Sequence, residues 1–70
     1  MKLIKQIDLT GTNVIIKVHH DIHMNPESYI ISVYINKDFI EDSVVRNIKF
    51  LDNQIQAVSS KWLNIIHLLK

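Results

Sequence analysis

The sequence predicts an α+β fold, in which a small antiparallel β-meander of three to four strands packs one face on a C-terminal α-helix. Two observations support this prediction. The first half of the 70-residue chain alternates apolar and polar residues, as half-buried strands do. The last third repeats apolar residues at steps of four and three, which is the spacing of a stripe along a helix. We expect a single domain spanning residues 1–70.

Three strands are predicted at residues 2–9, 14–22 and 28–36. Each segment is rich in β-branched residues, which favour strands. Turn-forming residues separate the segments, with Gly11 in the first connection and Pro26 in the second.

The predicted register keeps one apolar face across these three strands, because side chains alternate between the two faces of a sheet. Pairing Ile7 with Ile16 satisfies this condition in the first hairpin. Pairing Ile22 with Tyr29 satisfies it in the second and sets Ile16 opposite Ile35. The apolar residues expected on the buried face are Leu3, Ile7, Leu9, Val14, Ile16, Val18, Ile22, Tyr29, Ile31, Val33 and Ile35.

The segment 38–50 has two interpretations. As a strand over residues 39–46, it would place Ile40 and Val44 on the buried face, together with Asp42. As a helix, the two apolar residues would instead extend the later stripe. A helix running on to the C-terminus would be about 50 Å long, too long for a small sheet to cover. The β-branched and aromatic residues therefore favour a fourth strand.

A helix is predicted over residues 52–70, with Asp52 or Asn53 as its N-cap. Its last turns carry additional apolar residues, so that the apolar arc there exceeds half of the circumference. A single sheet covers a helix on one side only, and the excess therefore predicts a second contact. The stripe itself is formed by Leu51, Ile55, Val58, Trp62, Ile65 and Leu69.

Composition excludes some classes of protein. The hydrophobic content of 47% and charged content of 21% are typical of a folded globular chain. The absence of cysteine excludes disulfides and fits a reducing compartment, so we expect a cytoplasmic protein. No apolar stretch approaches the roughly 20 residues that span a bilayer. Thirteen isoleucines and frequent lysine and asparagine are typical of AT-rich coding, as in phages and other mobile elements.

We expect neither an enzyme nor a cofactor, because the serines lack a nucleophile-elbow context and the chain has no glycine-rich phosphate loop. The nearest pattern to a metal site is His19, Asp21 and His23, which alternate along a predicted strand. Imidazole and carboxylate are ligands for zinc or ferrous iron. No second ligand cluster accompanies them, so we predict no metal site and keep these three residues as the candidates for one.

Nucleic-acid binding is an alternative for the second sheet face. Lys17, His19, Tyr34 and Phe39 are predicted to share this face and could combine charge with base stacking. The net charge of +1, however, gives no reason to expect a polyanion as partner.

Protein binding is the function that the sequence favours. A chain of this length forms a small core and is often stabilised by association, and large apolar residues dominate interface energetics. We therefore predict a non-enzymatic, self-associating module, expected as a homodimer, that acts as a small inhibitor or modulator of a larger protein. The predicted interface residues are Trp62, Leu63, Ile66 and Leu68 on the helix and Tyr34 and Phe39 on the sheet.

Overall fold

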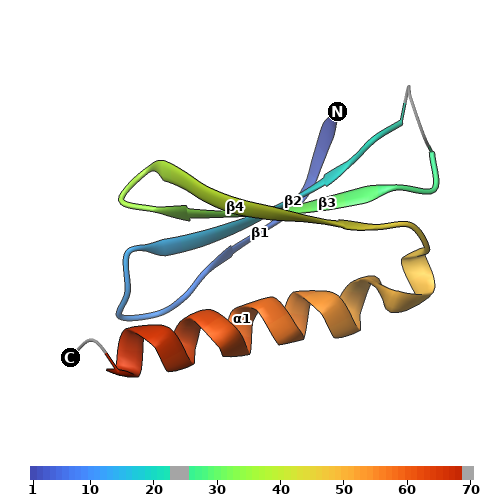
Figure 1. Cartoon of the computed structure of the whole chain (residues 1–70). Coiled ribbons are helices and arrows are strands. Elements are labelled where there is room, and N and C mark those ends of the chain that lie inside the picture. The colour runs from blue at the N-terminus through green and yellow to red at the C-terminus, as the bar shows by residue number, and fades with distance from the viewer. Residues whose placement is uncertain (23–25, 69–70) are drawn as a thin grey trace.

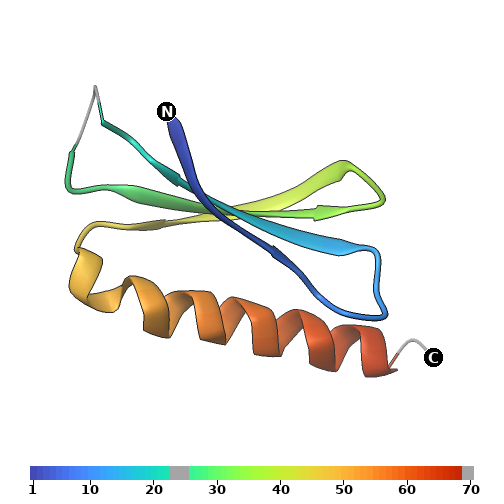
Figure 2. The same cartoon turned by 180° about the vertical axis from the view of Figure 1, so that it is seen from behind.

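The computed structural model describes residues 1–22 and 26–68 of the chain. Four strands form one antiparallel sheet in the order β1-β2-β3-β4, and the helix α1 lies along one of its faces (Figure 1). Seen from behind, the helix again lies below the sheet and the upper face is open (Figure 2). The predicted meander and C-terminal helix are confirmed. The element bounds are β1 Lys2–Asp8, β2 Val14–His20, β3 Tyr29–Ile35, β4 Asp38–Val45 and α1 Leu51–Leu68.

The first hairpin has the predicted register, with Ile7 opposite Ile16. Its turn is closed by Thr12. The Thr12 hydroxyl donates a hydrogen bond to the Leu9 carbonyl at 2.6 Å and accepts one from the Val14 backbone N–H, at the start of β2, at 3.1 Å. Gly11 adopts a φ of 78°, a conformation that glycine tolerates without steric cost.

The second hairpin differs from the prediction by two residues. His20, rather than Ile22, lies opposite Tyr29, and the two rings stack with centroids 4.6 Å apart. The His20 ring also donates through Nε2 to the Pro26 carbonyl at 2.6 Å. The loop is therefore longer than expected. A shift of two residues leaves every side chain on its predicted face, because the side-chain period of a strand is two.

The β3–β4 turn consists of Asn36 and Lys37, with φ values of 53° and 73°. Two successive residues with positive φ are typical of the type I′ turn, whose twist matches that of antiparallel strands. Asparagine tolerates this conformation well, whereas lysine is strained in it.

A bulge near Ile40 makes the predicted faces of β4 wrong. The register shifts by one residue between Tyr34, which lies opposite Phe39, and Val33, which lies opposite Glu41. The rest of the strand is consequently turned over. Covered positions on β4 are Glu41, Ser43 and Val45, whereas Ile40, Asp42 and Val44 are exposed.

A second bulge, on β1, lies between Leu3 and Lys5. Leu3 therefore pairs with His19 and leaves the covered face on which we expected it. Lys5 pairs with Val18, on the helix side of the sheet.

The start of the helix also corrects the prediction. A 3₁₀ turn, η1 (Ile48–Phe50), precedes α1, which begins directly at Leu51. The capping residue is Asn47, whose side chain accepts a hydrogen bond from the Lys49 backbone N–H at 2.9 Å. Asn47 therefore caps the 3₁₀ turn that leads into α1, whereas Asp52 and Asn53, the predicted caps, lie within the first turn of α1.

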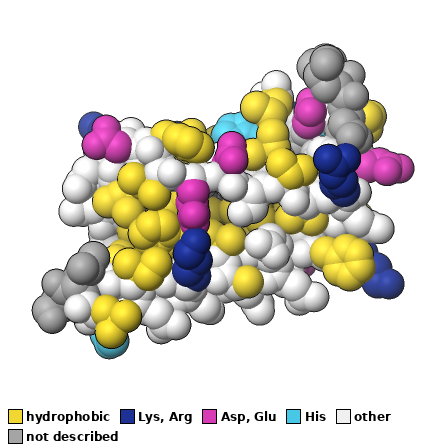
Figure 3. All heavy atoms as spheres, in the orientation of Figure 1, with side chains coloured by type: hydrophobic (Ala, Val, Ile, Leu, Met, Phe, Trp, Pro, Cys, Tyr) yellow, Lys and Arg dark blue, Asp and Glu magenta, His cyan; other side chains and the backbone are white. Residues whose placement is uncertain are grey.

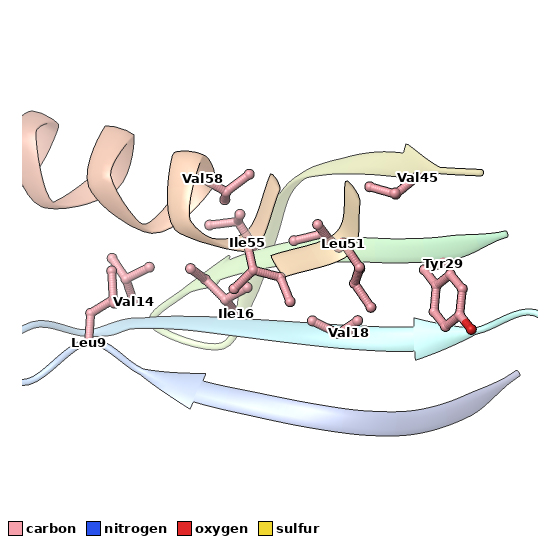
Figure 4. Close-up of a cluster of buried hydrophobic side chains, with 11 residues drawn as sticks. Leu9, Val14, Ile16, Val18, Tyr29, Val45, Leu51, Ile55 and Val58 are labelled. Atoms are coloured by element: carbon pink, nitrogen blue, oxygen red, sulfur yellow. The ribbon is translucent and has the colours of Figure 1, made fainter. Parts of the chain in front are cut away.

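The core lies between the sheet and the first half of α1 (Figure 4). The predicted stripe is confirmed there, because Leu51, Ile55 and Val58 are buried; Leu69 lies outside the described residues. The sheet contributes to the same buried cluster Leu9, Val14, Ile16, Val18, Tyr29, Ile31, Val33 and Val45.

Candidate protein-interaction surface

The sheet face opposite α1, here called the outer face, is not covered by any described residue (Figures 1 and 2). Its side chains form three rows across the four strands, each read from β1 to β4. The first row is Asp8, Ile15, Tyr34 and Phe39, the middle row is Gln6, Lys17, Ser32 and Asp42, and the third row is Leu3, His19, Ile30 and Val44.

The middle row is polar throughout, and the two flanking rows are mostly apolar. Phe39 and Val44, at the β4 end of the flanking rows, are 56% and 55% exposed. Leu3 is also exposed, at the β1 end. The outer face therefore holds two apolar bands separated by a polar line that crosses the strands.

Aromatic and cationic side chains meet on this face near the β3–β4 turn. The rings of Tyr34 and Phe39 pack edge to face, with centroids 5.8 Å apart. The Lys17 ammonium lies 4.9 Å from the centroid of the Tyr34 ring, in a cation–π contact. The contact holds the positive charge of Lys17 over the outer face instead of letting it extend freely into solvent.

The predicted interface residues of the helix lie on the opposite side of the molecule from the outer face. Trp62 and Ile66 pack partly buried against the core. Leu63 is exposed, and Leu68, near the helix end, is 85% exposed. Figure 3 shows hydrophobic side chains gathered between the sheet and the C-terminal half of the helix. The six predicted residues thus belong to two separate surfaces.

Glu41 joins the helix to β4. Its carboxylate accepts a hydrogen bond from Trp62 Nε1 at 2.9 Å and from Lys61 Nζ at 2.8 Å. The hydrogen bonds from Lys61 and then Trp62 hold the pKa of the Glu41 carboxyl below its usual value, because they stabilise its charged form. No sequence pattern indicates this contact, since Glu41 and Lys61 are twenty residues apart and belong to different elements.

The candidate metal ligands are only partly described. His19 lies on the outer face, β2 ends at His20, and His23 is outside the described residues. Asp21 follows the strand and donates its backbone N–H to the Ser28 carbonyl at 3.1 Å. Among residues 1–22 and 26–68, no three His, Asp or Glu side chains are grouped so that they could hold a metal ion.

Both edges of the sheet carry features that oppose the addition of another strand. β1 has its bulge and places Lys5 on the helix side, and β4 has its bulge and places Glu41 on that side. Bulges and inward-facing charges are the devices by which edge strands avoid pairing with other chains. Both edges are therefore poorly suited to pairing with a strand of another chain.

Comparison of the chain with models of protein families, with curated proteins and with solved structures finds no match. Within the described part of the chain, α1 is not long and apolar enough to cross a membrane.

Proposed function

We propose that the chain is a non-enzymatic protein-interaction module that associates with itself through its outer face. The observation that supports this most directly is the pair of apolar bands formed by the first and third rows, which end in the exposed side chains of Phe39 and Val44. Single exposed apolar residues are ordinary, but contiguous apolar area marks a contact site. The small core of a 70-residue chain gives an independent reason to expect association.

A comparison of two double variants tests this proposal. Phe39→Lys with Val44→Lys places charge in both apolar bands and is expected to weaken self-association at least about 100-fold, because an unpaired charge is costly to bury. The free energy of unfolding should change by less than about 1 kcal/mol, since both side chains are exposed in the monomer. Native mass spectrometry and sedimentation equilibrium over a concentration series give the association constant.

The matched control is Leu63→Lys with Leu68→Lys, which adds the same charge to the exposed surface of the helix. Association through the outer face predicts that this control keeps the wild-type constant. Loss of association in the helix variant alone would move the interface to the helix, leaving the outer face for another role. A wild-type chain that stays monomeric at millimolar concentration would contradict self-association altogether. The inhibitory action on a larger protein expected from the sequence would use whichever surface the dimer leaves open.

Single-stranded nucleic-acid binding is the second candidate, and one observation favours it. Tyr34 and Phe39 lie side by side on the outer face with Lys17 over one ring, a combination that single-strand-binding sheets use. Asp8 and Asp42 share this face, and their charge opposes a phosphate backbone. Retention on heparin at low salt, lost in Lys17→Glu, would favour nucleic acid over the protein module.

A further inference from the structure

We propose that the occupant of the outer face is a second copy of this chain. The two copies are related by a two-fold axis that lies between their sheets and runs parallel to β3. This inference depends on the proposed self-association and adds its geometry. In this arrangement the two sheets pack face to face with strands within about 30° of one another, as in aligned sheet sandwiches. Each of the three rows then faces the same row of the second copy, with the strand order reversed.

The charges of the middle row favour this two-fold arrangement. Lys17 lies on β2 and Asp42 on β4, one strand to either side of Ser32 on β3. A two-fold axis along β3 exchanges the positions of β2 and β4. Lys17 of each copy therefore faces Asp42 of the other, and Ser32 faces Ser32. The row is complementary to itself only when β3 faces β3, so the charges select this register from the alternatives.

The present contacts of these charges agree with such an arrangement. The described residues give the Asp42 carboxylate no hydrogen bond or ion pair, so it is available to a partner. Lys17 is held over the Tyr34 ring, and its ammonium is therefore presented on the face. Ser32, although on the outer face, is buried among its larger neighbours, and its small side chain allows the two middle rows to approach.

The apolar rows are matched by the same operation. In the first row Ile15 faces Phe39 and Tyr34 faces Tyr34. In the third row Ile30 faces Ile30, and His19 on β2 faces Val44 on β4. Phe39 and Val44, the exposed apolar side chains of β4 that belong to these rows, are covered, whereas β1 lies outside the contact between the two sheets.

The area of contact between the two outer faces determines how strong a dimer we expect. Three strands of seven residues span roughly 15 Å by 23 Å, or about 350 Å² of flat area per copy. This is less than half of the roughly 800 Å² that each partner buries in a standard interface. We therefore expect a concentration-dependent dimer with a Kd on the order of tens of micromolar rather than a permanent one.

A charge-reversal cycle tests the geometry. Lys17→Glu and Asp42→Lys, each alone, set like charges against each other at two symmetric places and should raise the dimer Kd at least about tenfold. The double variant Lys17→Glu with Asp42→Lys restores opposite charges and should return the Kd to within about threefold of wild type. Sedimentation equilibrium gives the constants. Lys49→Glu, on η1 and outside the outer face, is the matched control and should leave the Kd unchanged.

Each outcome decides a separate question. Weakening by both single variants with recovery in the double variant supports the two-fold arrangement. If the reversals leave the dimer Kd unchanged, or if the single variants raise the Kd and the double variant does not restore it, this geometry is wrong. The proposed self-association is unaffected by either result. A wild-type monomer at millimolar concentration overturns both. Circular dichroism checks the fold of each variant, and if a reversal unfolds the chain, Lys17→Gln and Asp42→Asn replace it, each expected to raise the Kd about threefold.

Discussion

The two faces of the sheet are built from the same strands but differ in what covers them. On the covered face, Ile16, Val18, Ile31 and Val33 are fully or almost fully buried under the helix. On the outer face the neighbouring positions are half-buried or exposed, apart from Ser32. Both faces contain isoleucine and valine, so composition alone does not separate them. The difference is that the covered face is apolar across its centre, whereas the outer face has a charged row there.

The proposed self-association would give the two faces different tasks. A continuous apolar centre contributes stability by excluding water. A polar row between apolar bands contributes little to folding but can specify how a partner is aligned. We therefore expect substitutions on the covered face to change the free energy of unfolding and substitutions on the outer face to change association.

The largest effect is expected from Ile16→Ala. Ile16 is 0% exposed and lies within the core cluster, so truncation removes buried apolar contacts and leaves a cavity. Such substitutions cost about 2–5 kcal/mol, which is a large part of the stability of a small domain. Urea unfolding followed by circular dichroism measures the loss.

The adjacent residue provides the matched control. Ile15→Ala makes the same truncation on the outer face, where the side chain is only partly buried, and should cost about 1 kcal/mol or less when measured on the monomer at low concentration. Equal losses for the two variants would mean that the outer face is as tightly packed as the core, and the comparison of the faces would then be wrong.

The sheet and helix could be predicted because their patterns are periodic over many residues. Val14, Ile16 and Val18 recur at every second residue, and the stripe from Leu51 to Val58 recurs at helical spacing. The structure buries both sets. The faces of β4 could not be predicted in this way, because its sequence holds apolar residues of either parity. The predicted strand buried the charged residue Asp42, which already argued against its assignment of faces. The bulge turns the strand over and places Asp42 on the outer face.

The candidate surface was predictable only in part. Tyr34 and Phe39 were expected on the outer face, and they lie there because the bulge begins after their pair. The middle row could not be derived, since it requires the observed register of β3 with β4 as well as that of β2 with β3. Similarly, the contact of Glu41 with the helix depends on the same bulge, which brings this carboxylate to the covered side.

The next effect in size concerns charge on the two faces of β4. Glu41→Gln removes a carboxylate that Lys61 and Trp62 hold, and should cost up to about 1 kcal/mol at pH 7, because the ion pair is partly exposed to solvent. The folded-state pKa of Glu41 lies below its unfolded value. Its stabilisation is therefore present above about pH 4.5 and lost as the pH falls through the folded-state value. Unfolding in urea should give a larger difference in free energy between variant and wild type at pH 7 than at pH 3.

Asp42→Asn is the control on the opposite face of the same strand. The described residues give this carboxylate no partner within the monomer. We expect its free energy of unfolding at pH 7 to stay within about 0.5 kcal/mol of wild type at low concentration. A loss at Asp42 as large as that at Glu41 would show that the outer face contributes electrostatic stability of its own.

The smallest effect is expected at the β3–β4 turn, where Lys37 borders the outer face beside Ile15 and Tyr34 without belonging to the three rows. Lys37 has a φ of 73°, a conformation that costs a residue with a Cβ about 1 kcal/mol or more. Lys37→Gly relieves this strain but increases the freedom of the unfolded chain, so the net gain should be about 0.5 kcal/mol. Because Lys37 lies outside the three rows, the dimer Kd should not change. A gain in stability at constant Kd would demonstrate that folding and association are controlled by separate parts of the sheet, whereas a shift in Kd would couple the turn to the outer face through the ring pair of Tyr34 and Phe39 next to it.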